Sequence, residues 1–96
     1  MTVCGIARHA VNDYDTWQKS YDGSAEYIKG MGVIADSVHR DLDNPNMVTV
    51  YHQFADAATA RAFAGRVNSA QYQGPAAESG NILLETMALM MMADVG

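Results

Sequence analysis

The chain is 96 residues long, the size of a single domain (residues 1–96), and 49% of its residues are apolar, which is generous for so short a polypeptide. Its formal net charge is −5 and its six basic residues are scattered, an arrangement that excludes nucleic acid as a partner. No apolar run approaches the roughly 20 residues of a membrane span, no secretory signal opens the sequence, and the lone Cys4 allows no internal disulfide, so we expect a cytoplasmic protein with no membrane partner.

The first predicted element is a strand over residues 2–11, a short run with Val, Ile and Ala. A helix follows, because Asn12 and Asp13 are residues that cap a helix N-terminus. The two glycines Gly30 and Gly32 are expected to end it. One face of this helix is apolar and aromatic, with intervals of three or four residues, and is predicted to be core: Tyr14, Trp17, Tyr21, Ala25 and Ile28. The alternative for its tyrosines is that one hydroxyl reaches a pocket.

Two strands, residues 33–42 and 47–55, are predicted on either side of a turn at residues 43–46. This turn contains Asp, Asn and Pro, which favour turns through their own backbone geometry and hydrogen bonds. Asp56 is predicted to cap a second helix, whose apolar face holds Ala60, Phe63, Ala64 and Val67. Residues 70–79 are ambiguous between a short helix and a loop.

A last apolar strand, residues 82–93, completes the order β-α-β-β-α-β. This order predicts an α+β, ferredoxin-like fold, in which a four-stranded antiparallel sheet carries both helices on one face. The last strand is apolar at both odd and even positions, so both faces of the sheet need cover. A second copy of the same sheet is the economical cover for the open face, and a homodimer is therefore expected.

Residues 8–17, residues 38–46 and the segment from Phe54 to Phe63 together resemble a known family. They resemble small members of the dimeric α+β barrel superfamily, the relatives of the antibiotic biosynthesis monooxygenases. The resemblance implies that two sheets close into a barrel and that a pocket lies inside it or between sheet and helices. Members of the superfamily include cofactor-independent monooxygenases of aromatic polyketides, polyketide cyclases, lactone isomerases and haem-degrading enzymes. The monooxygenase and haem-degrading branches carry a Trp late in the third strand, and Phe54 stands at that place here. The cyclase branch carries a pair of His after the second helix, and the matching residues 68–71 here contain no His.

The polar residues of the middle strands suggest a site. If residues 43–46 form a four-residue loop, Ser37 pairs with His52 and His39 with Val50. A mostly apolar face with a few polar groups is typical of a pocket for an apolar ligand. Asp36 would then lie with Arg40 on a solvated edge. The predicted pocket face holds Ala35, Ser37, His39, Val48, Val50, His52 and Phe54.

His52 is the predicted general base or acid, because imidazole titrates near neutrality, and His39 is the second catalytic candidate. The alternative for each is a histidine that packs in the core or at the rim. The predicted substrate-binding residues are Ser37, Val50 and Phe54 of this face, His9 at the end of the first strand, and Tyr72, which follows the second helix where superfamily members fold a lid.

No metal or tightly bound cofactor is expected. No two of the three His have a metal-ligand spacing, and the sequence has no phosphate loop or dinucleotide fingerprint. The predicted function is a cofactor-independent enzyme that acts on a small apolar aromatic or polyketide-like substrate, by monooxygenation or by cyclisation or isomerisation. The alternatives are a non-catalytic dimeric module that binds such a ligand and, third, a haem-binding protein, which Phe54 in place of Trp disfavours.

Overall fold

The structure of the chain, a computed structural model, describes residues 2–67 and 82–95, and the side chains of residues 2–66 and 88–95. The predicted order of strands and helices is confirmed, including the last strand over residues 82–93. Residues 70–79, whose structure the sequence leaves ambiguous, lie outside the described residues. The elements are β1 (Val3–Val11), α1 (Tyr14–Gly23), α2 (Ala25–Gly30), β2 (Val33–Arg40), β3 (Met47–Phe54), α3 (Ala57–Val67) and β4 (Ile82–Ala93).

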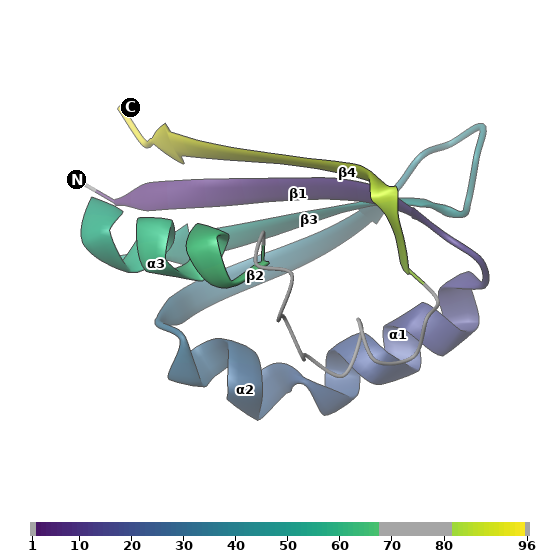
Figure 1. Cartoon of the computed structure of the whole chain (residues 1–96), viewed down its shortest axis with the longest axis horizontal. Coiled ribbons are helices and arrows are strands. Elements are labelled where there is room, and N and C mark those ends of the chain that lie inside the picture. Colours follow the sequence, from purple (N-terminus) through teal and green to yellow (C-terminus); the bar gives the residue numbers. More distant parts are fainter. Residues whose placement is uncertain (1, 68–81, 96) are drawn as a thin grey trace.

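The four strands form one antiparallel sheet in the order β2-β3-β1-β4. All three described helices lie on one side of this sheet (Figure 1), where α3 packs on β1, β3 and β4 and α2 packs on β2. The fold is therefore α+β and ferredoxin-like, as predicted. None of the described helices is long and apolar enough to cross a membrane.

The helix starts follow the predicted caps. The Asp13 carboxylate accepts a hydrogen bond from the Thr16 amide at 3.0 Å, and the Asp56 carboxylate accepts one from the Thr59 amide at 2.8 Å. Such side chains satisfy amides that have no partner within the helix.

The single helix predicted after β1 is two helices, α1 and α2, with a break at Ser24. The Ser24 hydroxyl donates to the Ser20 carbonyl at 2.7 Å, a local bond that competes with regular helix geometry. After α2 the chain turns sharply into β2 through Gly32, whose φ is +93° and where a Cβ would collide with the Thr59 side chain.

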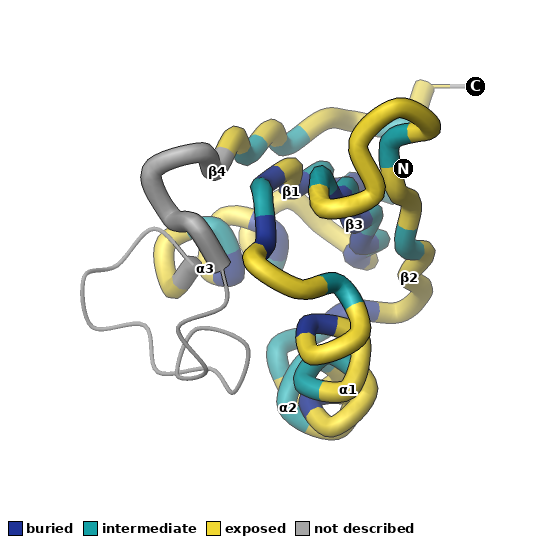
Figure 2. Tube along the Cα trace, turned by 90° about the vertical axis from the view of Figure 1, so that its right-hand side faces the viewer, coloured by how far each residue is buried: buried dark blue, intermediate teal, exposed yellow. Residues whose placement is uncertain are grey.

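The core lies between the sheet and the helices, where the buried segments gather in Figure 2. One cluster lies beneath α1 and another beneath α3, which confirms Trp17, Ala60 and Phe63 of the predicted helix faces as core, whereas Ala25, also predicted to be core, is exposed. The first cluster consists of Val11, Trp17, Val48 and Val50, and the second of Val33, Phe54, Ala60 and Phe63.

Candidate active site

β2 and β3 are joined by a five-residue loop, one residue longer than the predicted turn at residues 43–46. The Asp41 amide donates to the Met47 carbonyl at 3.1 Å, so this pair closes the hairpin and residues 42–46 form the loop. Arg40 supports the loop by donating from Nε to the Pro45 carbonyl at 2.8 Å. Because strand side chains alternate between faces, one extra loop residue exchanges the two faces of β2.

The predicted grouping of His39 and Ser37 with His52 is therefore wrong. Asp36, not Ser37, pairs with His52 across the hairpin. Ser37 and His39 face away from the helices, where Ser37 Oγ lies 2.9 Å from His39 Nε2 and both residues are exposed. Ala35 also lies on that side of the sheet. The part of the prediction confined to β3 is confirmed, since Val48, Val50, His52 and Phe54 share the helix-covered face.

His52 lies in the middle of β3 and is 6% exposed. Its Nε2 is 3.0 Å from the Tyr21 hydroxyl of α1, and the Phe63 ring of α3 contacts the imidazole edge-on at a centroid distance of 5.0 Å. Gly5 of β1 pairs with His52 across the sheet, and a Cβ at this position would lie only 2.7 Å from Met91 Sδ. The absence of a side chain at Gly5 lets neighbouring side chains close over the sheet beside His52.

The Tyr21 hydroxyl also donates to Asp36 Oδ2 at 2.6 Å, so it bridges the buried imidazole to an exposed carboxylate. A carboxylate only accepts hydrogen bonds, and a phenol has one proton. With its proton directed at Asp36, Tyr21 accepts from His52, and we assign the imidazole proton to Nε2. The other ring nitrogen, Nδ1, then carries the lone pair and has no hydrogen bond within the described part of the chain.

The surroundings of His52 keep it neutral at neutral pH. Burial lowers the pKa of His52 below the ordinary 6.5, and the Asp36 carboxylate opposes this shift without cancelling it. For Tyr21, burial and the hydrogen bond to Asp36 raise the pKa of the phenol, which therefore stays protonated. The three groups thus form a chain of one base, one neutral donor and one carboxylate.

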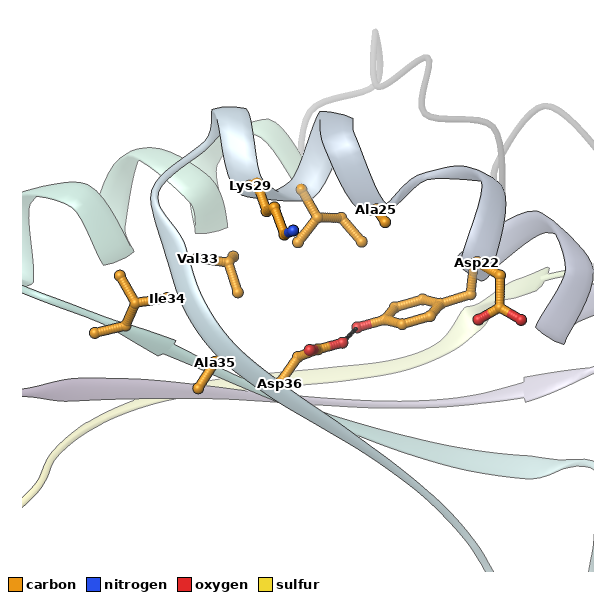
Figure 3. A pocket seen from close by; sticks show the side chains of 9 residues that line it. Asp22, Ala25, Lys29, Val33, Ile34, Ala35 and Asp36 are labelled. Carbon is orange, nitrogen blue, oxygen red and sulfur yellow. Dashed lines mark hydrogen bonds between the residues drawn. The ribbon is translucent and has the colours of Figure 1, made fainter.

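A pocket of about 200 Å³ opens where α1 and α2 pass over β2 (Figure 3). Its walls are mainly apolar, and its polar groups are the Tyr21 hydroxyl, Asp22, Lys29 and Asp36. The Tyr21 hydroxyl of α1 donates to Asp36 of β2, which Figure 3 labels, and both residues line the pocket, so the phenol–carboxylate bond forms one wall. The volume lies below the roughly 300 Å³ at which drug-sized pockets begin.

His9 and Trp17 form a second polar grouping on the helix-covered face. Their ring centroids are 6.0 Å apart, His9 is 4% exposed and Trp17 is 2% exposed. Among the described residues neither His9 ring nitrogen nor Trp17 Nε1 has a hydrogen-bond partner. Burial lowers the pKa of His9 to about 4, so this imidazole is neutral at neutral pH. His9 pairs with Val48, four residues from His52.

The other residues predicted to bind substrate lie in the core or outside the described part. Val50 and Phe54 are 3% and 0% exposed, and the Phe54 ring packs on Phe63 at a centroid distance of 5.2 Å. Tyr72 lies outside the described residues. The roles of these residues in substrate binding remain predictions. Within residues 2–67 and 82–95, no group of three or more His, Cys, Asp or Glu is arranged to hold a metal ion.

Sequence reasoning misses the two partners of His52. The sequence predicts Tyr21 as core and Asp36 as part of a solvated edge, whereas the structure joins them by a hydrogen bond. Arg40, also predicted to be on that edge, lies over the Tyr14 ring at 3.7 Å from its centroid. The signal that could have found Asp36 is the hairpin register, because a five-residue loop pairs it with His52.

Known proteins resemble this chain in structure. No family model and no curated protein sequence matches it. The structure of SnoaB, a cofactor-independent oxygenase from Streptomyces nogalater, matches with a TM-score of 0.73 and 13% identity over 99% of this chain and 94% of SnoaB. A presumed antibiotic biosynthesis monooxygenase from Bordetella bronchiseptica matches with a TM-score of 0.78 and 13% identity over 99% of this chain and 98% of that chain. A presumed antibiotic biosynthesis monooxygenase from Nitrosomonas europaea matches with a TM-score of 0.71 and 11% identity over 98% of this chain and 90% of that chain.

These identities are too low to carry over any residue's role, and they establish a likeness of fold. The resemblance found in the sequence is thereby confirmed at the level of the fold. The chain shares its fold with this cofactor-independent oxygenase and with these two presumed antibiotic biosynthesis monooxygenases.

Proposed function

We propose that this protein is a cofactor-independent enzyme that oxygenates a small, largely apolar aromatic or polyketide-like substrate, with His52 as the base. The observation that carries the proposal is the hydrogen-bonded chain from His52 through Tyr21 to Asp36. It leaves a neutral imidazole with a lone pair on Nδ1, which is what a general base requires near neutral pH. The fold shared with an oxygenase described as cofactor-independent supports the same reaction class.

The reaction requires mainly two things of the protein, a base and an apolar environment. Removing a proton from an electron-rich phenol, or from the CH₂ group of its keto form, produces an anion that dioxygen can oxidise directly. In the balanced reaction, CH₂ and O₂ give C=O and H₂O: dioxygen oxidises the carbon, supplies the carbonyl oxygen and loses its second oxygen as water. His52 takes the proton that starts the reaction, and the apolar residues around it favour a neutral, aromatic substrate.

Oxygen consumption tests this proposal. We expect the purified protein, in the presence of a metal chelator, to consume dioxygen with at least one member of a panel of anthrones and naphthols. Mass spectrometry after reaction under ¹⁸O₂ should find one labelled oxygen atom in the product. Conversion without oxygen uptake would instead indicate a cyclase or isomerase, and binding without conversion would indicate the non-catalytic module. A Soret band on titration with haem would favour the third alternative.

We also infer that the protein is a homodimer joined through the open face of its sheet, the face opposite the helices. This face exposes apolar side chains, since Met90 is 55% and Met92 is 39% exposed and both pair with β1 residues of that face. A two-fold axis would place this patch against itself. We expect sedimentation equilibrium to give a dimer for the wild type and a monomer for Met90→Glu, because the new carboxylate would be buried in the interface.

Ala58→Glu provides the matched control for this dimer test. Ala58 is exposed in the first turn of α3, on the helix side of the sheet, where an added carboxylate is favourable. This variant should remain a dimer. A wild type that sediments as a monomer, or a Met90→Glu variant that stays dimeric, would contradict the assignment of the interface.

A further inference from the structure

We propose that Tyr21 and Asp36 form a proton path that connects His52 to solvent in the pocket between α1, α2 and β2. The path rests on the proposed role of His52 as base and adds two residues to it. It assigns to the pocket a function in proton transfer rather than in holding the whole substrate, for which the volume of about 200 Å³ is small.

The distances satisfy the first requirement of such a path. The two contacts along it, from His52 Nε2 to the Tyr21 hydroxyl and from that hydroxyl to Asp36 Oδ2, are 3.0 Å and 2.6 Å. Both lie within normal hydrogen-bond range, so no atom has to move far for a proton to pass.

Burial supplies the second requirement, a reason for the path. His52 is 6% exposed, and burial disfavours its charged form, so a protonated imidazole is costly at this position. Asp36, by contrast, is exposed and lines the pocket with Tyr21. The largely buried imidazole, which must exchange protons, is therefore linked through one hydroxyl to an exposed carboxylate.

The transfer balances without charging the imidazole. The substrate proton binds to His52 Nδ1, the proton on Nε2 moves to the Tyr21 oxygen, and the Tyr21 proton moves to Asp36, which releases it to water. The ring is neutral before and after, with its proton on the other nitrogen. When water forms later in the reaction, a proton returns from solvent through Asp36 and Tyr21 to His52 Nε2. The Nδ1 proton then leaves with the product water, and His52 is again in its starting tautomer.

The remaining charged groups of the pocket do not offer an equivalent route. Asp22 of α1 and Lys29 of α2 line the pocket, but among the described residues neither is hydrogen-bonded to Tyr21 or His52. Asp36 is the charged group whose field acts on His52. Asp22 is thus a suitable comparison, since its removal takes the same charge from the same pocket and leaves the path intact.

Chemical rescue tests the path. We expect Tyr21→Phe and Asp36→Ala each to lower kcat by about 10²-fold, because proton transfer by a positioned group contributes at least that much. Formate at tens of millimolar should restore much of the activity of Asp36→Ala in a saturable manner, since it supplies a carboxylate beside the remaining Tyr21 hydroxyl. It should not restore Tyr21→Phe, in which the connecting hydroxyl is missing, and Asp22→Ala should not respond to formate.

An NMR measurement checks the tautomer and the charge coupling on which the path depends. In ¹⁵N spectra the wild type should hold the His52 proton on Nε2, and Asp36→Ala should lower the His52 pKa because the carboxylate that raises it is gone. Near wild-type turnover by both Tyr21→Phe and Asp36→Ala would overturn the path while leaving His52 as the base. Absence of turnover in the wild type would contradict the proposed function itself, and equal stimulation of all variants by formate would overturn the path.

Discussion

Replacement of His52 by glutamine is expected to lower kcat/KM by about 10²–10⁴-fold, the usual contribution of a positioned general base. The glutamine side chain is polar and similar in length, and its amide can still hydrogen-bond to the Tyr21 hydroxyl that faces His52. The variant should therefore fold and melt at nearly the wild-type temperature. Steady-state oxygen uptake and thermal unfolding of the same preparation measure the two effects.

The pH profile provides a second signature of the same residue. A base works in its deprotonated form, so kcat/KM of the wild type should rise with pH through the His52 pKa and then level off. Burial lowers this pKa, which places the midpoint below 6.5. The residual activity of His52→Gln should lose this step. A profile with its midpoint well above 6.5 would show that another group is the base.

His39→Gln shows which face of the sheet carries the chemistry. His39 is exposed, is hydrogen-bonded to Ser37, and lies on the opposite face from His52. We expect its replacement to change kcat/KM by less than about threefold, because glutamine keeps a polar side chain on the face proposed to join two copies and the proposed base lies on the other face. If His39→Gln is inactive and His52→Gln is active, the reaction belongs to the open face, and the proposed role of His52 is wrong.

The local elements of this fold are predictable because the signals for them are local. Asp13 and Asp56 cap helices where the sequence places them, and the last strand spans residues 82–93 as expected. Such caps and apolar runs act over three or four residues, and tertiary contacts do not override them here. The break at Ser24 directly follows Gly23, a residue that weakens a helix interior, but the serine–carbonyl hydrogen bond at the break leaves no distinctive pattern.

The site is less predictable because it depends on register. Pro45 and its neighbours mark a turn correctly, but the sequence does not fix whether four or five residues form the loop. The difference of one loop residue decides whether Ser37 or Asp36 pairs with His52. The contact with Tyr21 depends in addition on how α1 packs across the sheet, which side-chain spacing along α1 does not reveal.

Acid should destabilise the folded protein well before the carboxylates titrate, and His9 should account for most of the loss. Burial holds the pKa of His9 at about 4 in the folded protein, whereas an unfolded chain has a His pKa of about 6.5. Between these values the unfolded chain binds the proton and the folded one does not. The stability is therefore complete above about pH 6.5 and is lost as the pH falls toward about 4, by about 3 kcal/mol in total for this one group. His52, whose pKa is also lowered by burial, adds to the loss in the same direction.

Urea unfolding of the wild type and His9→Leu at pH 7.5, 6, 5 and 4 measures this effect. Leucine is close to histidine in size, and it removes two ring nitrogens that have no partner among the described residues. The free energies of unfolding of the two proteins should diverge as the pH falls, with the variant the more stable, since titration of every other group is common to both. If His9→Leu instead loses stability in parallel with the wild type down to pH 4, the folded protein protonates His9 as readily as the unfolded chain does, and a proton acceptor must lie beside its ring.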